Sequence, residues 1–259
     1  MTARLSVAII ARNEERNLPA CLASVAFADE VVVVDHASTD RTVQIARERG
    51  ARVVETADWP GFGPQKNRAL DACTGDWILS LDADERVTAG LRAEIERTLA
   101  QPRFDVYEMP RLSTYCGRFM RHGGWHPDHV RRLFRRGAAR FSDATVHESL
   151  VTDRPVGRLD EPIVHYSFRT MDDVIAKINR YSSDSAAALA ARGAAPGLAS
   201  AIAHGLAAFL RTYVFKLGFL DGRRGFLLAV SNAEGSYYRY VKAMLAAEAR
   251  RGAPRDDVD

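Results

Sequence analysis

Cysteines and long apolar runs are scarce in this 259-residue chain, and each scarcity excludes a class of protein. The three cysteines, Cys21, Cys73 and Cys116, are isolated, so neither a disulfide framework nor a Cys-x-x-Cys zinc site is expected. No membrane-spanning helix of roughly 18 to 20 residues is expected, and LSVAII before Arg12 is too short for a signal-peptide core. These absences favour a protein of the reducing cytoplasm.

Charge and glycine patterning exclude two further classes. A net charge of +3 is small beside 36 basic and 33 acidic residues, so bulk charge does not indicate a nucleic-acid binder. No G-x-G-x-x-G follows an apolar run, which disfavours a dinucleotide oxidoreductase. The first apolar run continues into ARNEERN instead of a glycine-rich phosphate loop, which disfavours a nucleotidyltransferase.

Four short apolar runs alternate with amphipathic segments in the first hundred residues. The runs are LSVAII (5–10), EVVVVD (30–35), ARVVET (51–56) and DWILSLD (76–82). Near-continuous apolar runs are typical of strands covered on both faces. Caps or first-turn residues for the intervening helices are expected at Asn17, at 38–40, at Pro64 and at Thr88. The order predicts an α/β fold with a doubly wound, mainly parallel sheet.

The rest of the chain has a looser pattern and then a helical one. Residues 104–170 contain short strand-like pieces, which we interpret as the second half of a main domain that spans 1–170. Residues 171–250 are interpreted as a helical extension, with a break at 193–197 and a last helix that starts near Ser231. The polar tail, 251–259, is expected to be disordered.

Acidic residues stand at the end of two buried strands. Asp82 and Asp84, at i and i+2, can present to the same side, and hard carboxylate oxygens suit Mg²⁺ or Mn²⁺ held together with a substrate's phosphates. The alternative is a solvated turn or acids that cap the helix after Thr88. Asp35 ends another strand before HASTDRT, and ARNEE follows the first strand. Three successive strand ends therefore carry polar residues along the edge where such sheets bind ligands.

Four segments carry a resemblance to a known family. SVAIIARNEERNL, VVVVDHASTDRT, GPQKNRAL and GDWILSLDADE resemble, in that order, the nucleotide-sugar-binding half of family 2 glycosyltransferases with the GT-A fold. The resemblance covers about the first hundred residues closely. It implies that Asp35 binds the uracil of a UDP-sugar, with Glu14 and the backbone of Ala11 lining the nucleoside pocket. It further implies that Lys66 lies near the donor, that Asp82 faces the ribose and sugar, and that Asp84 holds a divalent metal.

The middle segment is expected to carry the acceptor side. W-x-PD, RLFRR, VHE and HYSF resemble the lipopolysaccharide core glucosyltransferases, which add a β-linked glucose to an inner-core heptose. An inverting transfer needs a carboxylate to take the proton from the acceptor hydroxyl. We expect Glu148 to be this base, with Asp128 as the second candidate. Glu148 could instead be a surface acid paired with Arg140 or Arg154.

The roles of several histidines stay open, including one at a position where this sequence differs from the family pattern. His147 could be a supporting metal ligand, together with Asp82 and Asp84, or a hydrogen-bonded core histidine. Four further histidines are interpreted as structural: His122, His126, His129 and His165. His36 stands where the family commonly has a small residue, which affects the shape of the base pocket.

Basic residues gather in two places. Arg131, Arg132, Arg135, Arg136 and Arg140 could bind the phosphates of an anionic glycolipid acceptor or form a solvated face. If VRRLFRR is a strand, alternate arginines face opposite ways. Between 198 and 245, aromatic and apolar residues mix with Lys and Arg, which is typical of an element on an anionic membrane surface. Packing against the main domain or a second subunit is the alternative.

These observations predict a metal-dependent inverting glycosyltransferase. It would transfer a sugar, which we expect to be glucose, from a UDP-sugar to a lipopolysaccharide inner-core or other lipid-linked acceptor. The reaction would take place at the inner face of the inner membrane. One alternative keeps the enzyme class and uses a protein or polyprenyl phosphate as acceptor. The other is a non-catalytic UDP-sugar-binding protein associated with the membrane.

Overall fold

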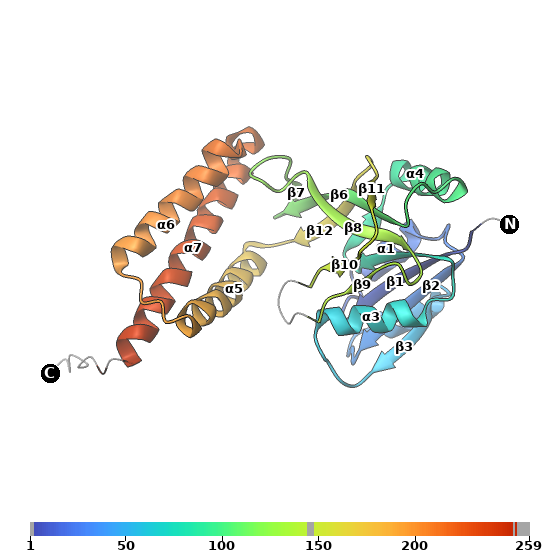
Figure 1. The fold of residues 1–259 in the computed structure, drawn as a ribbon, viewed down its shortest axis with the longest axis horizontal. Helices are drawn as coiled ribbons and strands as arrows, with labels where there is room; N and C mark the ends of the chain where they lie inside the picture. The colour runs from blue at the N-terminus through green and yellow to red at the C-terminus, as the bar shows by residue number, and fades with distance from the viewer. Residues whose placement is uncertain (1–2, 144–147, 251, 253–259) are drawn as a thin grey trace. The chain divides into compact units, whose positions relative to one another are not determined.

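The computed structural model describes residues 3–143, 148–250 and 252, which form two compact units (Figure 1). Unit 1 comprises Met1–Leu112 and Pro127–His165, and unit 2 comprises Ser113–His126 and Tyr166–Asp259. The predicted disordered tail and His147 lie outside the described residues, apart from Gly252. The division into a catalytic domain over 1–170 and a helical extension over 171–250 is a division by function, and it stays a prediction.

A single mixed sheet forms the centre of unit 1. Its strands are β1 (Leu5–Ala11), β2 (Glu30–His36), β3 (Arg52–Thr56), β4 (Trp77–Asp82), β5 (Glu85–Val87), β6 (Val106–Tyr115), β8 (Asp128–Arg135) and β12 (Ile163–Phe168), in the spatial order β3-β2-β1-β4-β8-β6-β12-β5. The first four are parallel, as predicted. Three further pairs are antiparallel: β4 with β8, β8 with β6, and β12 with β5. The short strands β11 (Val156–Arg158) and β7 (Arg118–Phe119) pair with β6, while β9 (Arg140–Phe141) and β10 (Leu150–Val151) pair with each other.

Helices cover both faces of the parallel strands. Alternate residues of β1 divide between two core clusters: Val7 and Ile9 lie with residues of α1 (Leu18–Ser24), α2 (Thr42–Glu48) and α4 (Ala89–Ala100). Ala8 lies with residues of α3 (Phe62–Ala72). Both faces of β1, β2 and β4 are thus mainly buried, which explains the continuous apolar runs in the sequence. The predicted α/β class is confirmed.

The predicted helix caps are only partly correct. Thr88 caps α4 by accepting a hydrogen bond from the backbone N–H of Leu91 at 3.0 Å. Asn17 precedes α1 but makes no capping hydrogen bond, because its amide donates to Glu14 Oε2 at 2.7 Å. Pro64 lies within the first turn of α3 and does not open it, since that helix begins at Phe62.

Glu30 ties β2 to the loop before β4 and gives unit 1 a pH-dependent stability. Its Oε2 accepts hydrogen bonds from Ser6 Oγ at 2.5 Å and from the Thr74 N–H at 2.7 Å, and its Oε1 lies 3.0 Å from Arg52 Nη2. Burial raises the pKa of Glu30, but these hydrogen bonds outweigh burial and lower the pKa from 4.5 to about 2. The carboxylate therefore stabilises the folded state above about pH 4.5, and this stabilisation is lost as the pH falls toward 2.

We expect Glu30→Gln to lower the free energy of unfolding at pH 7 by about 1 to 2 kcal/mol, because hydrogen bonds to a charged acceptor are lost. Urea unfolding at pH 7 and pH 3 should show the deficit shrinking in acid. Glu48→Gln, on the exposed end of α2, removes a carboxylate from the same unit and should change little at either pH. A deficit of equal size at both pH values would contradict this role for Glu30.

Unit 2 consists mainly of helices. These are α5 (Met171–Ala191), α6 (Leu198–Leu210), a π-helical turn (Arg211–Phe215), a 3₁₀ turn (Gly218–Asp221) and α7 (Gly222–Arg250). Tyr115, Met120, Val174 and Leu228 form its buried core. The predicted start of the last helix near Ser231 is wrong, because α7 begins nine residues earlier at Gly222. Gly225 lies in α7 against the Gly218 carbonyl, where a Cβ has no room.

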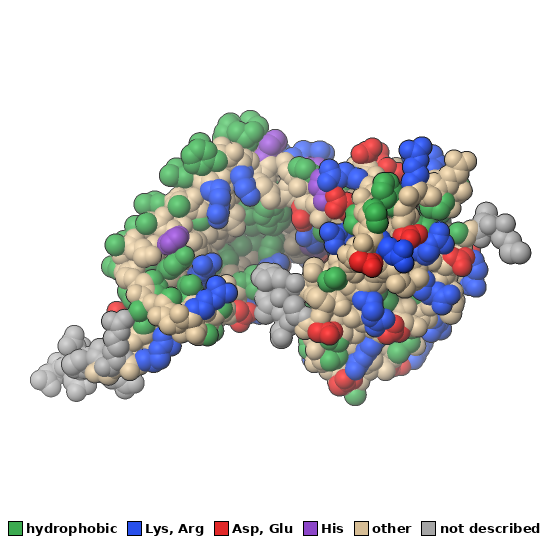
Figure 2. All heavy atoms as spheres, viewed as in Figure 1, with side chains coloured by type: hydrophobic (Ala, Val, Ile, Leu, Met, Phe, Trp, Pro, Cys, Tyr) green, Lys and Arg blue, Asp and Glu red, His purple; other side chains and the backbone are tan. Residues whose placement is uncertain are grey.

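One side of α6 is apolar and exposed. Leu198, Ile202, Leu206, Leu210 and Val214 recur every four residues and are each 45 to 61% exposed; we call them the α6 stripe. Figure 2 shows apolar side chains along the edge of unit 2 where α6 lies. By length and composition alone, Leu198–Phe215 could cross a membrane, with a mean hydropathy of 1.3 and 22% of the segment buried. The expectation that the chain does not span a membrane stays a prediction.

Candidate active site

Three strand ends lie side by side at one edge of the sheet. In the strand register Ala11 of β1 is opposite Asp35 of β2, and Ile10 is opposite Asp82 of β4. The predicted polar strand ends are therefore neighbours at the carboxyl edge of the parallel strands. This is the edge where open α/β sheets bind ligands.

The loops after β1 and β2 hold each other in place. Asp35 is buried, and its two oxygens accept hydrogen bonds from the N–H and the hydroxyl of Ser38. The Glu14 N–H donates to Thr42 Oγ1 at 2.7 Å, across from the first loop to the second. Ala11 is buried between these loops and the core. The three predicted nucleoside-binding residues thus lie at or just after the carboxyl ends of β1 and β2.

Aromatic side chains lie beside Asp35. The His36 ring is buried, with its centroid 5.2 Å from that of Trp59, and Trp59 meets Phe62 edge-on at 4.9 Å. Trp59 and Phe62 are 40% and 43% exposed. His36 therefore supports an exposed aromatic surface next to the buried acid, and such a surface can stack against a flat ring.

Acids and bases alternate along a continuous network across the site, in the order Glu148, Lys66, Asp82, Arg132, Glu85, Arg111 and Asp128. Lys66 Nζ lies 3.3 Å from Glu148 Oε1 and 2.8 Å from Asp82 Oδ1. Arg132 Nη2 lies 2.6 Å from Asp82 Oδ2 and 2.7 Å from Glu85 Oε1. Arg111 lies 3.9 Å from Glu85 and 2.5 Å from Asp128. We call these residues the charge network.

Asp82 and Arg132, at the middle of the charge network, stabilise each other's charged forms. Burial would raise the pKa of Asp82, but Arg132 and Lys66 outweigh it and hold the pKa well below its usual range. Burial would lower the pKa of Arg132, but Asp82 and Glu85 raise it above its usual value. Glu85 is fully buried and also accepts the Asp82 N–H at 3.0 Å. Arg132 and Glu85 therefore fix the orientation of the D-x-D turn.

A cavity of about 560 Å³ opens over this network. Its lining includes Lys66, Asp82, Arg111, Arg132 and Glu148. Of the two carboxylates predicted as the base, Glu148 lines the cavity, with its side chain 21% exposed. Asp128 is not among the lining residues, and its Oδ2 accepts hydrogen bonds from Arg111 Nε and Nη2 at 3.0 and 2.5 Å.

Asp84 is paired with His165, a histidine that was interpreted as structural from the sequence. His165 Nε2 lies 3.1 Å from Asp84 Oδ2, although 81 residues separate them in the chain. The pairing arises because β12 runs antiparallel to β5, which places His165 opposite Glu85. The sequence carries only an indirect signal for it, the strand-like HYSF segment, since no spacing rule links distant strands.

The Asp84–His165 pair fits a divalent ion that is bound together with phosphate. Within 3–143 and 148–250, no group of three or more His, Cys, Asp and Glu residues could hold a metal alone. Mg²⁺ commonly binds through one or two carboxylates and completes its shell with substrate phosphates and water. Asp82 directs both oxygens to Lys66 and Arg132. His147, the other suggested ligand, lies outside the described residues.

The basic cluster, expected either to bind phosphates or to form a solvated face, does not act as one group. Arg131 is exposed and Arg132 buried, as their alternation in β8 requires. Arg135 and Arg140 form exposed ion pairs with Asp105 and Asp71. Only the first two arginines line the cavity.

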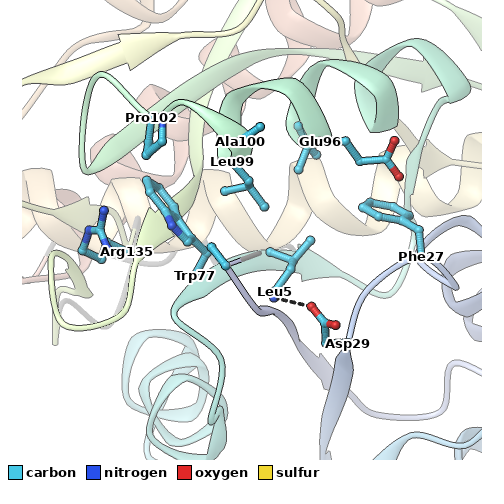
Figure 3. A pocket seen from close by; sticks show the side chains of 11 residues that line it. Leu5, Phe27, Asp29, Trp77, Glu96, Leu99, Ala100, Pro102 and Arg135 are labelled. Carbon is cyan, nitrogen blue, oxygen red and sulfur yellow. Dashed lines mark hydrogen bonds between the residues drawn. The ribbon is translucent and has the colours of Figure 1, made fainter. Parts of the chain in front are cut away.

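A second cavity in unit 1, of about 670 Å³, lies at the opposite edge of the sheet. Figure 3 shows Leu5 and Trp77, at the amino ends of β1 and β4, facing Leu99 and Pro102. Asp29 accepts the Leu5 N–H at 2.7 Å, and Arg135 lies over the Trp77 ring. This cavity is mainly apolar and belongs to the packing of α4, away from the strand ends that carry the charge network.

Residues 6–149, more than half of the chain, match the family model "Glycosyl transferase family 2". The chain belongs to this family. The resemblance predicted from the sequence is confirmed, the fold is of the GT-A type, and the protein is a glycosyltransferase enzyme.

Named relatives cover nearly the whole of this glycosyltransferase. It is 30% identical to "Lipopolysaccharide core biosynthesis glycosyltransferase LpsC" of Rhizobium meliloti (strain 1021), over 98% of this chain and 96% of the relative. It is 31% identical to an "Uncharacterized glycosyltransferase" of Rickettsia bellii (strain RML369-C), over 93% and 86%. Among solved structures it is similar to glucosyl-3-phosphoglycerate synthase from Mycobacterium tuberculosis in complex with Mn²⁺, UDP and glucosyl-3-phosphoglycerate. That similarity has a TM-score of 0.37 and 25% identity and covers 43% of this chain and 44% of the other.

Proposed function

We propose that this glycosyltransferase transfers a sugar from a UDP-sugar to a lipopolysaccharide inner-core or other lipid-linked acceptor, and that this sugar is glucose. The transfer would invert the configuration at the anomeric carbon and would require Mg²⁺ or Mn²⁺. The observation that carries the proposal is the Glu148–Lys66–Asp82 arrangement inside one cavity, beside the Asp84–His165 pair. The nearly full-length similarity to a relative named for lipopolysaccharide core biosynthesis supports the acceptor class.

The donor would lie along the carboxyl edge of the parallel strands. The uracil ring of the donor would contact Asp35, Ala11 and Glu14. The ribose and the sugar would contact Asp82, whose position Arg132 and Lys66 fix. Asp84 and His165 would hold the metal, which when bound neutralises charge on the leaving diphosphate. The protein's own contribution is a rigid site, because a buried ion-pair network keeps these side chains in place.

Glu148 would act as the base. As the acceptor oxygen attacks the anomeric carbon, the Glu148 carboxylate takes the hydroxyl proton, and the bond between the sugar and UDP breaks on the opposite face. Lys66, 3.3 Å away, positions the carboxylate. A base inside the cavity also speaks against the alternative of a non-catalytic UDP-sugar-binding protein.

The acceptor would be reached at a membrane surface. The α6 stripe exposes five apolar side chains, and Arg211 and Lys216 lie in and just after the turn that continues α6. Apolar residues beside cations favour peripheral binding to an anionic membrane, which corresponds to the inner face of the inner membrane. The same surface would serve a polyprenyl phosphate acceptor.

Calorimetric titration with UDP-glucose tests the donor assignment, with UDP-galactose, UDP-GlcNAc and GDP-mannose as controls, each with and without Mn²⁺. We expect one UDP-sugar to bind at least about tenfold more tightly with the metal, because Asp84 and His165 would hold an Mn²⁺ ion that neutralises charge on the diphosphate. GDP-mannose should not bind. Metal-independent binding, or no binding of any UDP-sugar, would contradict the proposal.

A further inference from the structure

A cavity of about 570 Å³ lies entirely within unit 2. Its walls come from the loop at Gly123–Trp125, from Phe168, and from α5, the π-helical turn and α7. Tyr115, Trp125, Phe168 and Tyr181 give it an aromatic side. No residue of this cavity belongs to the charge network of unit 1.

Four cations line the cavity and no carboxylate does. The cations are Lys177 on α5, Arg211 in the π-helical turn, Lys216 just after it and Arg239 on α7. Across the described residues, none of the four forms a salt bridge with an acidic side chain. Unit 2 as a whole carries 15 Lys and Arg against nine Asp and Glu, although the complete chain has a net charge of only +3. The cavity therefore has a positive field that the protein does not neutralise.

One of these cations has unused hydrogen-bonding capacity. Arg239 Nε is buried and makes no hydrogen bond within the described part of the chain, and its guanidinium lies 5.0 Å from the centre of the Tyr240 ring. Lys177 Nζ lies 4.7 Å from the centre of the Phe168 ring and 5.3 Å from that of Tyr181. A buried donor without a partner in a cationic cavity indicates an anionic ligand that would supply the acceptor atoms.

The walls are fixed without a ligand. The Tyr115 hydroxyl and Ser231 Oγ are 2.7 Å apart, and Asn232 Nδ2 donates to Thr212 Oγ1 at 3.1 Å. Gly124 has a φ of +80°, and a Cβ there would lie 2.4 Å from Lys216 Cδ. The glycine thus lets the Lys216 side chain cross the loop, while the Gly123 N–H donates to the Lys216 carbonyl at 2.7 Å.

The apolar surroundings indicate what the anion is attached to. Arg211 and Lys216 flank the end of the α6 stripe, where Val214 is 45% and Phe215 78% exposed. A ligand whose charged group enters the cavity would therefore place the adjoining part of the molecule against exposed aliphatic and aromatic side chains. An anionic amphiphile matches both surfaces, whereas a soluble anion matches only the cavity.

We propose that the unit 2 cavity binds the phosphate head group of a membrane amphiphile, with its acyl chains along the α6 stripe. As the binding site of the lipid-linked acceptor, the cavity rests on the proposed function; as a lipid-phosphate site, it stands alone. Lys177, Arg211, Lys216 and Arg239 are the residues that would contact the phosphate.

Flotation of the purified full-length protein with phosphatidylcholine vesicles, with and without phosphatidylglycerol, tests the proposal. We expect binding only to the phosphatidylglycerol vesicles, and we expect Lys177→Gln with Lys216→Gln to weaken it at least about tenfold. The matched control is Arg180→Gln with Arg192→Gln, which removes the same charge from exposed positions outside the cavity. This control should weaken binding less than about threefold. Circular dichroism checks that both variants keep their helices.

Three results would overturn the proposal. Equal losses in the two double variants would mean general attraction to an anionic surface. Unchanged binding in the cavity variant would place the contact elsewhere. Calorimetric binding of inorganic pyrophosphate without any vesicle binding would mean a site for soluble anions. Because vesicle binding needs neither donor nor turnover, it can fail while metal-dependent UDP-sugar binding succeeds, or succeed while donor binding fails.

Discussion

Replacement of Asp84 by Ala is expected to lower turnover about 1000-fold or more and to remove metal-dependent donor binding. The Asp84 carboxylate is the protein's acidic metal ligand in the proposed site, and with it gone only the His165 imidazole would remain of the pair. The side chain lies at the mouth of a strand, is 26% exposed and belongs to neither core cluster of unit 1. Thermal unfolding should therefore change little, and steady-state kinetics with calorimetry of UDP-glucose and Mn²⁺ measure the two losses.

Two further variants sharpen this test. Asp84→Asn keeps the size of the side chain and removes its charge, so metal-dependent binding should fall nearly as far. Asp71→Ala removes a 60%-exposed carboxylate that pairs with Arg140 on the surface of the same unit, and it should leave activity unchanged. If Asp84→Ala retains activity within about threefold of the native protein, the metal does not bind at this residue.

Glu148→Gln is expected to lower kcat by about 10² to 10⁴ and to leave donor binding intact. Gln has the same size and can still accept a hydrogen bond from Lys66, but it cannot take a proton from the acceptor. Product formation with a heptose-containing acceptor, beside calorimetry of UDP-glucose, separates these two effects. A loss of donor binding equal to the loss of turnover would indicate a role in binding and not in proton transfer.

Asp128→Asn is the matched comparison for Glu148→Gln. The carboxylate of Asp128 is bound by Arg111 and does not line the cavity, so its replacement should cost less than about tenfold. A larger loss for Asp128→Asn than for Glu148→Gln would transfer the base assignment to Asp128. Full turnover in both variants would mean that neither carboxylate takes the proton from the acceptor hydroxyl.

The parallel half of the sheet could be predicted because its determinants are local. Each of β1, β2 and β4 is a continuous apolar run that ends in a polar turn, and two covered faces leave no other use for such runs. The carboxyl ends of parallel strands must share one edge. Asp35 and Asp82 could therefore be assigned to a common ligand edge before any coordinates were known.

The antiparallel half of the site depends on register between distant strands, which a single sequence does not encode locally. His165 reaches Asp84 only because β12 pairs with β5, and Arg132 reaches Asp82 and Glu85 only because β8 pairs with β4. The alternation in VRRLFRR correctly predicts that neighbouring arginines face opposite ways. It does not indicate which one is buried, since burial depends on the two carboxylates that neutralise it.

The division of the chain into units has a consequence for how this protein can be shortened or recombined. Unit 2 takes Ser113–His126 from between two parts of unit 1, so the backbone passes from one unit to the other three times. A truncation after His165 would keep every residue of unit 1. It would, however, remove Val174 and Leu228, against which Tyr115 and Met120 pack. The truncated protein would expose the apolar side chains of residues 113–126 to solvent and would tend to aggregate. Exchange of acceptor specificity between relatives by swapping C-terminal segments would accordingly require residues 113–126 to travel with the helices.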